Sequence, residues 1–211
     1  MKPMKEFYEK QASELIKNLN RRNMDAFYCP DGASAVKKAM SLIRKGSTVS
    51  FGGSMTLTEC GMMDALHSAD IKLLDRARAK TPEETTDIYH QALSADSYLM
   101  SSNAVTLDGQ LVNVDGNGNR VAALIYGPAQ VILMVGMNKV VKDVDSAYKR
   151  IHTLTAPTNA MRLSLKTPCQ ASGICRDCTS PDCICAQTVI TRYSRAKGRI
   201  TVILIGETLG Y

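Results

Sequence analysis

Five cysteines lie close together near the end of the chain, and their spacing is typical of a metal site. Cys169, Cys175, Cys178, Cys183 and Cys185 fall within seventeen residues. Two of them, at 175 and 178, have the separation that lets two thiolates reach one ion. Four thiolates with no histidine nearby in the sequence favour zinc or a 4Fe–4S cluster, since both accept sulfur ligands. We therefore predict a zinc or iron–sulfur centre in a Cys-rich loop over residues 168–186.

The other two cysteines are predicted to be packing residues. Cys29 ends a short apolar run and Cys60 lies in a helix-like segment, where a free thiol usually behaves as a small hydrophobic side chain. Residues 1–17 mix Lys and Glu and lack the apolar core of a secretory signal. We therefore expect a cytoplasmic protein, in which a local cysteine cluster more often binds metal than forms disulfides. The alternative is a loop of reduced thiols without a ligand.

A glycine-rich turn follows a short buried strand and could bind an anion. Gly52, Gly53 and Ser54 connect a strand predicted over residues 47–51 to a helix that begins near residue 55. Free backbone N–H groups at the start of a helix attract phosphate or carboxylate. Glu59, on the same helix, could face this site as an acid or a base. The alternative is that the glycines are present for steric reasons only.

A second group of polar residues lies near the turns predicted after residue 100. Turns favour Asn, Asp and Gly, so Asn103, Asp115 and Asn119 can be explained by local structure alone. A turn does not require Arg120 or Lys139, and either side chain could bind an anionic substrate. Together with Glu59, Asp115 and Arg120 are the candidate catalytic residues.

Helices and strands must position these residues, and the hydrophobic periodicity predicts an α/β fold. Up to residue 100, short apolar strands alternate with amphipathic helices, which favours a largely parallel open sheet covered by helices. Beyond residue 103 the pattern predicts an antiparallel β-meander with strands over 105–107, 111–114 and 121–125. The other strands are expected over 26–29, 47–51, 71–74, 97–100, 131–135 and 200–205. Helices are expected within 1–22 and over 31–46, 55–60, 82–93 and 143–155, the last ending before Pro157.

The composition predicts one globular domain over residues 1–211. The chain is 45% hydrophobic and 22% charged, as is usual for globular proteins. Its longest apolar runs are far shorter than the roughly 20 residues that a membrane-spanning helix needs. The net charge of +6 is spread along the chain without a recognition motif. We therefore expect neither a nucleic-acid partner nor a membrane span, and a homo-oligomer remains open.

Several runs of residues resemble one known family along nearly the whole chain. They are Ser102–Thr106 with Asp108-Gly109, Asn113–Ala123, Tyr126-Gly127-Pro128, Gly136–Val141, Ala156–Ala160 and Leu209-Gly210-Tyr211. Together they resemble the LUD (lactate utilisation, formerly DUF162) family, in its small form with a C-terminal Cys-rich motif.

The resemblance implies a fold, a ligand site and a set of metal ligands. The implied fold is an open Rossmann-like sheet of the NagB/RpiA/CoA-transferase-like type, whose ligands bind at the carboxyl ends of the strands. By position, the cleft would be lined by Gly52, Gly53, Ser54, Asn103, Asp115, Asn119, Arg120 and Lys139. The family's cysteine pattern matches Cys169, Cys175, Cys178 and Cys185 as metal ligands, and Cys183 stands where Arg is common and is the alternative fourth ligand.

Three hypotheses of function follow. In the first, as the resemblance implies, the protein is a redox accessory subunit of organic-acid utilisation that holds the metal centre and works with iron–sulfur partner subunits. In the second, it is an enzyme or sensor for a small anionic metabolite, such as a sugar phosphate, acyl-CoA or carboxylate, and the metal is structural. In the third, it is a binding module without chemistry, because the sequence alone identifies no proton-transfer pair.

Overall fold

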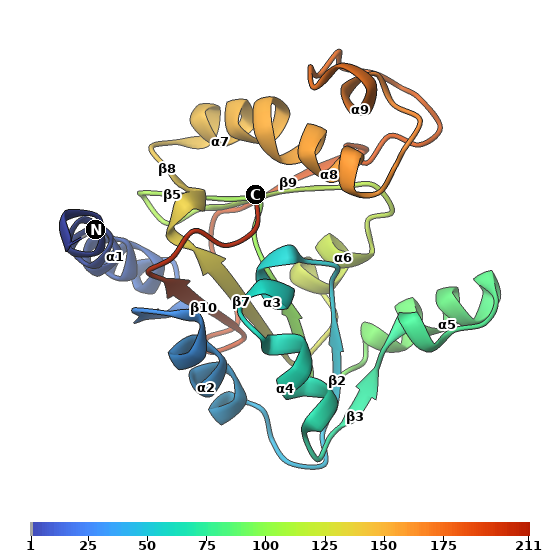
Figure 1. Cartoon of the computed structure of the whole chain (residues 1–211). Helices are drawn as coiled ribbons and strands as arrows, with labels where there is room; N and C mark the ends of the chain where they lie inside the picture. Colours follow the sequence, from blue (N-terminus) through green and yellow to red (C-terminus); the bar gives the residue numbers. More distant parts are fainter. Residues whose placement is uncertain (1) are drawn as a thin grey trace.

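A parallel sheet forms the centre of the molecule (Figure 1) in the computed structural model, which describes residues 2–211. Its strands are β1 (Asp25–Cys29), β2 (Thr48–Phe51), β3 (Lys72–Leu74), β4 (Ser97–Met100), β7 (Gln130–Gly136) and β10 (Ile200–Ile205). They pair in the order β1-β10-β7-β4-β2-β3, and every pairing is parallel. The predicted fold class, an α/β protein with an open and mostly parallel sheet, is confirmed.

The side chains of the central sheet alternate between two apolar layers, because successive residues of a strand point to opposite faces. On β7, Val131, Leu133 and Val135 belong to one layer, and Ile132 and Met134 belong to the other. The first layer packs against α1 (Lys2–Arg21), α5 (Pro82–Ala92) and α6 (Asn119–Ile125). The second packs against α2 (Gly32–Leu42), α3 (Met55–Glu59) and α4 (Met62–Ser68). Both faces of the sheet are therefore covered.

A second, smaller sheet packs against the helical segment over residues 144–162. It consists of β5 (Ala104–Thr106), β6 (Leu111–Asp115), β8 (Val140–Val141) and β9 (Gln187–Thr191), in the order β8-β5-β6-β9. The predicted β5–β6 hairpin is present, and its strands pair antiparallel. Two helices, α7 (Val144–Arg150) and α8 (Ala156–Arg162), follow β8, and Ala147, Ile151 and Ala156 pack on the small sheet. In Figure 1 these helices and α9 (Pro168–Ser172) lie above the central strands.

The predicted meander is wrong in its third strand. Residues 119–125 form helix α6, and the strand that pairs with β6 from outside the hairpin is β9. Val121 and Leu124 are buried three residues apart, which is a helical spacing, and the two alanines between them favour helix. The pairing of β9 with β6 joins segments far apart in the sequence, so no local pattern indicates it.

The predicted end of a helix before Pro157 is also wrong. The chain continues from α7 through a π-helical segment, Ile151–Thr155, directly into α8. Proline lacks the N–H that would close a hydrogen bond in an α-helix, and a wider π-turn accommodates such an interruption. Asn159 and Arg162 are consequently held on a continuous helix.

The remaining predicted elements are present, and their ends differ from the predictions. The helix expected to reach residue 46 stops at Leu42, and the turn of 3₁₀-helix after β3, Arg76–Arg78, follows no predicted pattern. Within residues 2–211, no helix has both the length and the apolar character that crossing a membrane requires.

Candidate functional site

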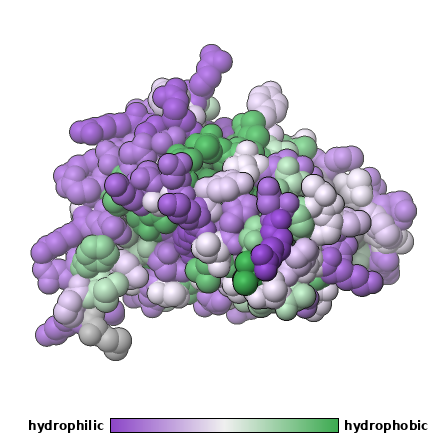
Figure 2. Space-filling model, turned by 90° about the horizontal axis from the view of Figure 1, so that it is seen from above, coloured by the Kyte–Doolittle hydropathy of each residue, from purple (hydrophilic) through white to green (hydrophobic). Residues whose placement is uncertain are grey.

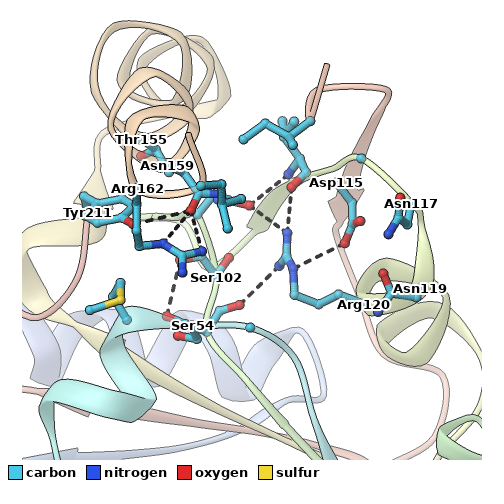
Figure 3. Close-up of a pocket in the computed structure, with 18 of the residues that line it drawn as sticks. Ser54, Ser102, Asp115, Asn117, Asn119, Arg120, Thr155, Asn159, Arg162 and Tyr211 are labelled. Atoms are coloured by element: carbon cyan, nitrogen blue, oxygen red, sulfur yellow. Dashed lines mark hydrogen bonds and ion pairs between the residues drawn. The ribbon is translucent and has the colours of Figure 1, made fainter. Parts of the chain in front are cut away.

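A polar cleft of about 260 Å³ opens at the carboxyl ends of β2, β4 and β7. These strands are followed by Gly53 and Ser54, by Ser101–Asn103 and by Lys139, respectively. The other walls come from the turn after β6, from α8, and from Ile184 and Tyr211 (Figure 3). The edge formed by the carboxyl ends of parallel strands is the general ligand site of open α/β sheets.

The cleft brings together most of the residues that the sequence indicates as ligand-binding or catalytic. Those that line it are Gly53, Ser54, Asn103, Asp115, Asn119, Arg120 and Lys139. Gly52 does not line the cleft, and its N–H donates to the carbonyl oxygen of Leu99 at 2.8 Å. Glu59 also lies outside, where its Oε2 accepts a hydrogen bond from the backbone N–H of Gly210 at 2.6 Å.

The two glycines of the turn make room for two arginines. A Cβ atom at Gly52 would lie 3.0 Å from Cδ of Arg120, and one at Gly53 would lie 2.6 Å from Nη2 of Arg76. The helix that follows, α3, is only five residues long, and the Ser54 side chain makes no capping hydrogen bond. The geometry of the turn therefore supports the steric explanation of these glycines.

Arg120 is buried at the centre of a hydrogen-bond network (Figure 3). Its guanidinium contacts Oδ1 of Asn113 (2.6 Å) and of Asn103 (3.0 Å), the carbonyl oxygens of Ser101 (3.3 Å) and Val114 (2.7 Å), and Oδ2 of Asp115 (3.3 Å). These acceptors match the five N–H donors of a guanidinium. Arg120 therefore joins the ends of β4 and β6, and it has no donor left for a substrate.

Arg76 offers free donors to the cleft. Its guanidinium lies over the ring of Tyr89, 5.9 Å from the ring centre, and it makes no hydrogen bond or ion pair within residues 2–211. The sequence pattern does not single out Arg76. Its position directly after β3 could have done so, because it lies at the same edge of the sheet as the glycine-rich turn.

Arg162 is a second source of donors, at the end of α8. Its Nε and Nη2 donate to Oδ1 of Asn159 at 3.1 and 2.8 Å, and the Tyr211 hydroxyl donates to the same oxygen at 3.3 Å. Nη1 has no acceptor in the part of the chain that the structure describes. Asn159 and Arg162 have i, i+3 spacing, so a helix that continued past Pro157 would have placed both on one face.

The charges of the cleft are predominantly positive. Its lining contains four basic side chains, those of Arg76, Arg120, Lys139 and Arg162, and one acidic side chain, that of Asp115. Because Asp115 and Arg120 pair with each other, the guanidinium groups of Arg76 and Arg162 dominate the local field. An anion is the ligand that this field attracts.

Lys139 is the most deeply buried of these cations, with only 4% of its surface exposed. Its Nζ donates to Oγ1 of Thr56 at 2.7 Å and to Oγ of Ser101 at 3.2 Å. The pKa of Lys139 is lowered to about 7, chiefly by burial and to a lesser extent by the nearby charges of Arg150 and Arg120, while Glu59 opposes the shift. A substantial share of this amine is therefore uncharged at neutral pH.

The cysteine loop has the donor atoms of a metal site. All seven thiols are free. The pKa of Cys185 is raised to about 12, chiefly by burial and to a lesser extent by the nearby thiols of Cys183, Cys175 and Cys169. In the conformation of residues 2–211, however, no group of three or more His, Cys, Asp and Glu side chains is close enough together to hold a metal ion. The cysteine thiols are suitable ligands for a thiophilic metal, but their positions in this structure do not form a metal site. We therefore assign no metal-dependent step to the protein.

His152 contacts this loop, which the sequence does not indicate. Its Nδ1 lies 3.3 Å from Sγ of Cys175, and its ring packs on Tyr148 at 4.2 Å between ring centres. Its Nε2 is buried without a partner among the described residues. Seen from above, this side of the molecule has hydrophobic areas within a largely hydrophilic surface (Figure 2).

The two cysteines outside the loop, Cys29 and Cys60, pack in the second apolar layer, as predicted.

These features define an open α/β protein with a small cationic cleft at the carboxyl ends of its parallel strands. The LUD domain matches residues 12–205, and the chain therefore belongs to the LUD-domain (lactate utilisation) family. A search of the curated proteins gave no match.

Three solved structures are similar to this chain to different extents. The chain is similar to a DUF162 family protein from Deinococcus radiodurans, with a TM-score of 0.53 and 10% identity over 94% of this chain and 98% of the other. At this identity the likeness shows the fold alone. Ribose 5 phosphate isomerase A from Neisseria gonorrhoeae matches 54% of this chain and 54% of its own length, at 14% identity and a TM-score of 0.34. The protein eIF2B delta from Chaetomium thermophilum matches 55% of this chain and 50% of its own length, at 15% identity and a TM-score of 0.36.

Proposed function

We propose that the cleft binds a small organic anion, and that the protein acts on or senses this metabolite in organic-acid utilisation. The observation that carries the proposal is the guanidinium of Arg76, which lies in the cleft without a partner in residues 2–211. Hydrogen bonds from a guanidinium to a carboxylate or phosphate are strong and often paired. At about 260 Å³ the cleft suits a metabolite smaller than a typical drug.

The neutral side chains around the cations support the same proposal. Ser54, Ser102, Asn119 and Asn159 all line the cleft and can bond the hydroxyl or carbonyl groups of a bound acid. Asp115 is not a free base, because Oδ1 accepts from the Gly118 N–H at 2.9 Å and Oδ2 pairs with Arg120. Ligand binding is therefore better supported by this geometry than proton transfer by Asp115.

Arg76→Gln is expected to weaken binding of the anion by about tenfold or more, because one charge-assisted hydrogen bond is worth roughly 1.5–3 kcal/mol. Isothermal titration calorimetry with L-lactate, pyruvate, ribose 5-phosphate and acetyl-CoA would identify the anion class and measure the loss. Arg162→Gln should weaken binding as well.

Arg78→Gln is the matched control, since Arg78 lies on the same 3₁₀ turn, is exposed and does not line the cleft. It should leave the affinity unchanged. Equal losses in Arg76→Gln and Arg78→Gln would point to general charge attraction and contradict a specific site, as would the absence of binding by every compound.

A second proposed function, the redox accessory role, rests on the cysteine loop. Cys169, Cys175 and Cys183 all act on the Cys185 thiol although they are spread along the loop. Deprotonated thiols held so close repel each other, and a cation or cluster would relieve this repulsion. We propose that the loop closes around zinc or a 4Fe–4S cluster, with Cys169, Cys175, Cys178 and Cys185 as ligands and Cys183 as the alternative fourth.

Protein purified without oxygen is expected to contain about one zinc or about four iron atoms per chain. Elemental analysis and the visible absorption spectrum would tell the two apart. Cys175→Ser should lose most of the metal, whereas Cys60→Ala, which removes a thiol outside the loop, should retain it. Metal-free protein after anaerobic reconstitution with either metal would contradict this role.

A further inference from the structure

The hydrogen bonds of Lys139 are those of a neutral amine. The Thr56 hydroxyl donates its proton to the carbonyl oxygen of Leu209 at 3.1 Å, and the Ser101 hydroxyl donates to that of Ser102 at 3.5 Å. Both hydroxyl oxygens therefore accept from Nζ, which accounts for two N–H bonds. An ammonium has three donors, and no third acceptor of Nζ occurs within residues 2–211. Two donated hydrogen bonds are the number that a neutral amine, with two N–H bonds, can make.

The groups that face Lys139 favour the same uncharged state. Arg150 on α7 and Arg120 on α6 are cations, and both lower the pKa of the amine, as burial does. Among residues 2–211, the anion that acts on it is Glu59 on α3, which is exposed and makes no ion pair with it. Gly210 has no side chain to crowd Nζ of Lys139, whereas a Cβ atom at this position would lie 3.2 Å from Nζ. Lys139 also lines the cleft, as does Ser101, which accepts a hydrogen bond from Nζ, so a ligand in the cleft would lie near the amine.

We propose that Lys139 is a nucleophile that forms an imine with a small 2-oxo acid bound in the cleft. This inference rests on the proposed function, since it uses the same cleft and the same cations. A 2-oxo acid has both groups that this site could bind. Its carboxylate would bind the guanidinium groups of Arg76 and Arg162, and its neighbouring carbonyl would react with the amine.

The step is balanced without an oxidant or a reductant. The lone pair of Nζ attacks the carbonyl carbon, a C–N bond forms, and the carbonyl oxygen takes up a proton. The hydroxyl group then leaves together with the second amine proton as one molecule of water, and a C=N bond forms. Protonation of this imine gives the cationic iminium. An ammonium could not begin this sequence because it has no lone pair.

Reductive trapping tests the inference. The full chain is incubated with pyruvate or glyoxylate and cyanoborohydride, which reduces an iminium to a stable secondary amine, and the adduct is located by intact mass and peptide mapping. We expect one adduct per chain, at Lys139, with a rate that rises with pH through about 7, the pKa of this amine. A rate that rises only at much higher pH would instead indicate reaction at an ordinary surface amine.

Lys139→Met should abolish the adduct, and Lys139→Arg, which keeps a cation, should abolish it too. Lys142→Met is the matched control, because Lys142 is exposed and close in sequence, and it should react like the original protein. Melting temperatures would show that each variant is folded. Trapping spread over surface lysines, or equal trapping in Lys139→Met, would overturn the inference.

Binding of L-lactate, which has no carbonyl group for the amine to attack, separates this inference from the proposed function. If L-lactate binds in an Arg76-dependent way but neither pyruvate nor glyoxylate gives an adduct at Lys139, the imine is ruled out and the anion site is retained. Loss of both would reject the cleft as an anion site.

Discussion

Arg120→Met is expected to lower the free energy of unfolding by about 3–5 kcal/mol, as is typical when one partner of a buried ion pair is removed. The substitution would leave Asp115, whose side chain is 9% exposed, without its cation. It would also remove donors from Asn113 and Asn103 and from two backbone carbonyl oxygens at the strand ends. Buried acceptors without a donor cost free energy individually, so the losses add to the broken pair.

Urea unfolding followed by circular dichroism would measure this change. Arg120→Lys should also be destabilising, since an ammonium cannot reproduce the planar fork of donors. Arg192→Met, at an exposed position, is the control and should change stability by no more than about 0.5 kcal/mol. A loss below about 1 kcal/mol in Arg120→Met would show that the network does not hold the strand ends together.

Lys139→Met is expected to change how stability depends on pH. The pKa of Lys139 is about 7 in the folded chain against an ordinary value of 10.5. Between these values the unfolded state binds more protons, so the original protein gains stability as the pH rises from about 7 to about 10. The shift, 10.5 − 7 = 3.5, corresponds to roughly 3–5 kcal/mol. The stability of the methionine variant relative to the original should fall by this amount over that range.

The comparison between variants removes the contribution of other groups that titrate at high pH. Lys142→Met should show no such trend, because its side chain is exposed. Parallel stability curves for Lys139→Met and the original protein would mean that Lys139 remains charged when folded. In that case the neutral-amine assignment would fail together with the imine.

Local patterns in the sequence predict the central sheet well. Its strands are short, mostly apolar runs next to turn residues. Parallel strands covered on both faces are buried at every position, as Ser97–Met100 and Ile200–Ile205 are. The errors occur where tertiary structure decides. Residues 119–125 are apolar enough for a strand, yet they fold as a helix, and Pro157 lies inside a helix because the π-turn before it absorbs the missing hydrogen bond.

The cleft is predicted only in part, because residue type does not reveal how a side chain is used. Arg120 and Lys139 are both unexplained cations in the sequence, but one is fully bonded to the protein and the other borders the cleft with a lowered pKa. Arg76 reaches the cleft from the turn after β3, and Arg162 reaches it from the end of α8. Their roles depend on contacts between segments distant in sequence, which periodicity cannot show.

Gly116 lies where the cysteine loop touches the turn that borders the cleft. A Cβ at this residue would be 3.0 Å from Cα of Ile184 and 3.5 Å from the carbonyl oxygen of Cys183, and Ile184 itself lines the cleft. If the loop binds the proposed metal and the cleft binds the proposed metabolite, both would act on this one stretch of backbone. By thermodynamic reciprocity, a metabolite that favoured one state of the thiols would itself be bound more tightly in that state. The affinity for the metabolite would then depend on the state of the thiols.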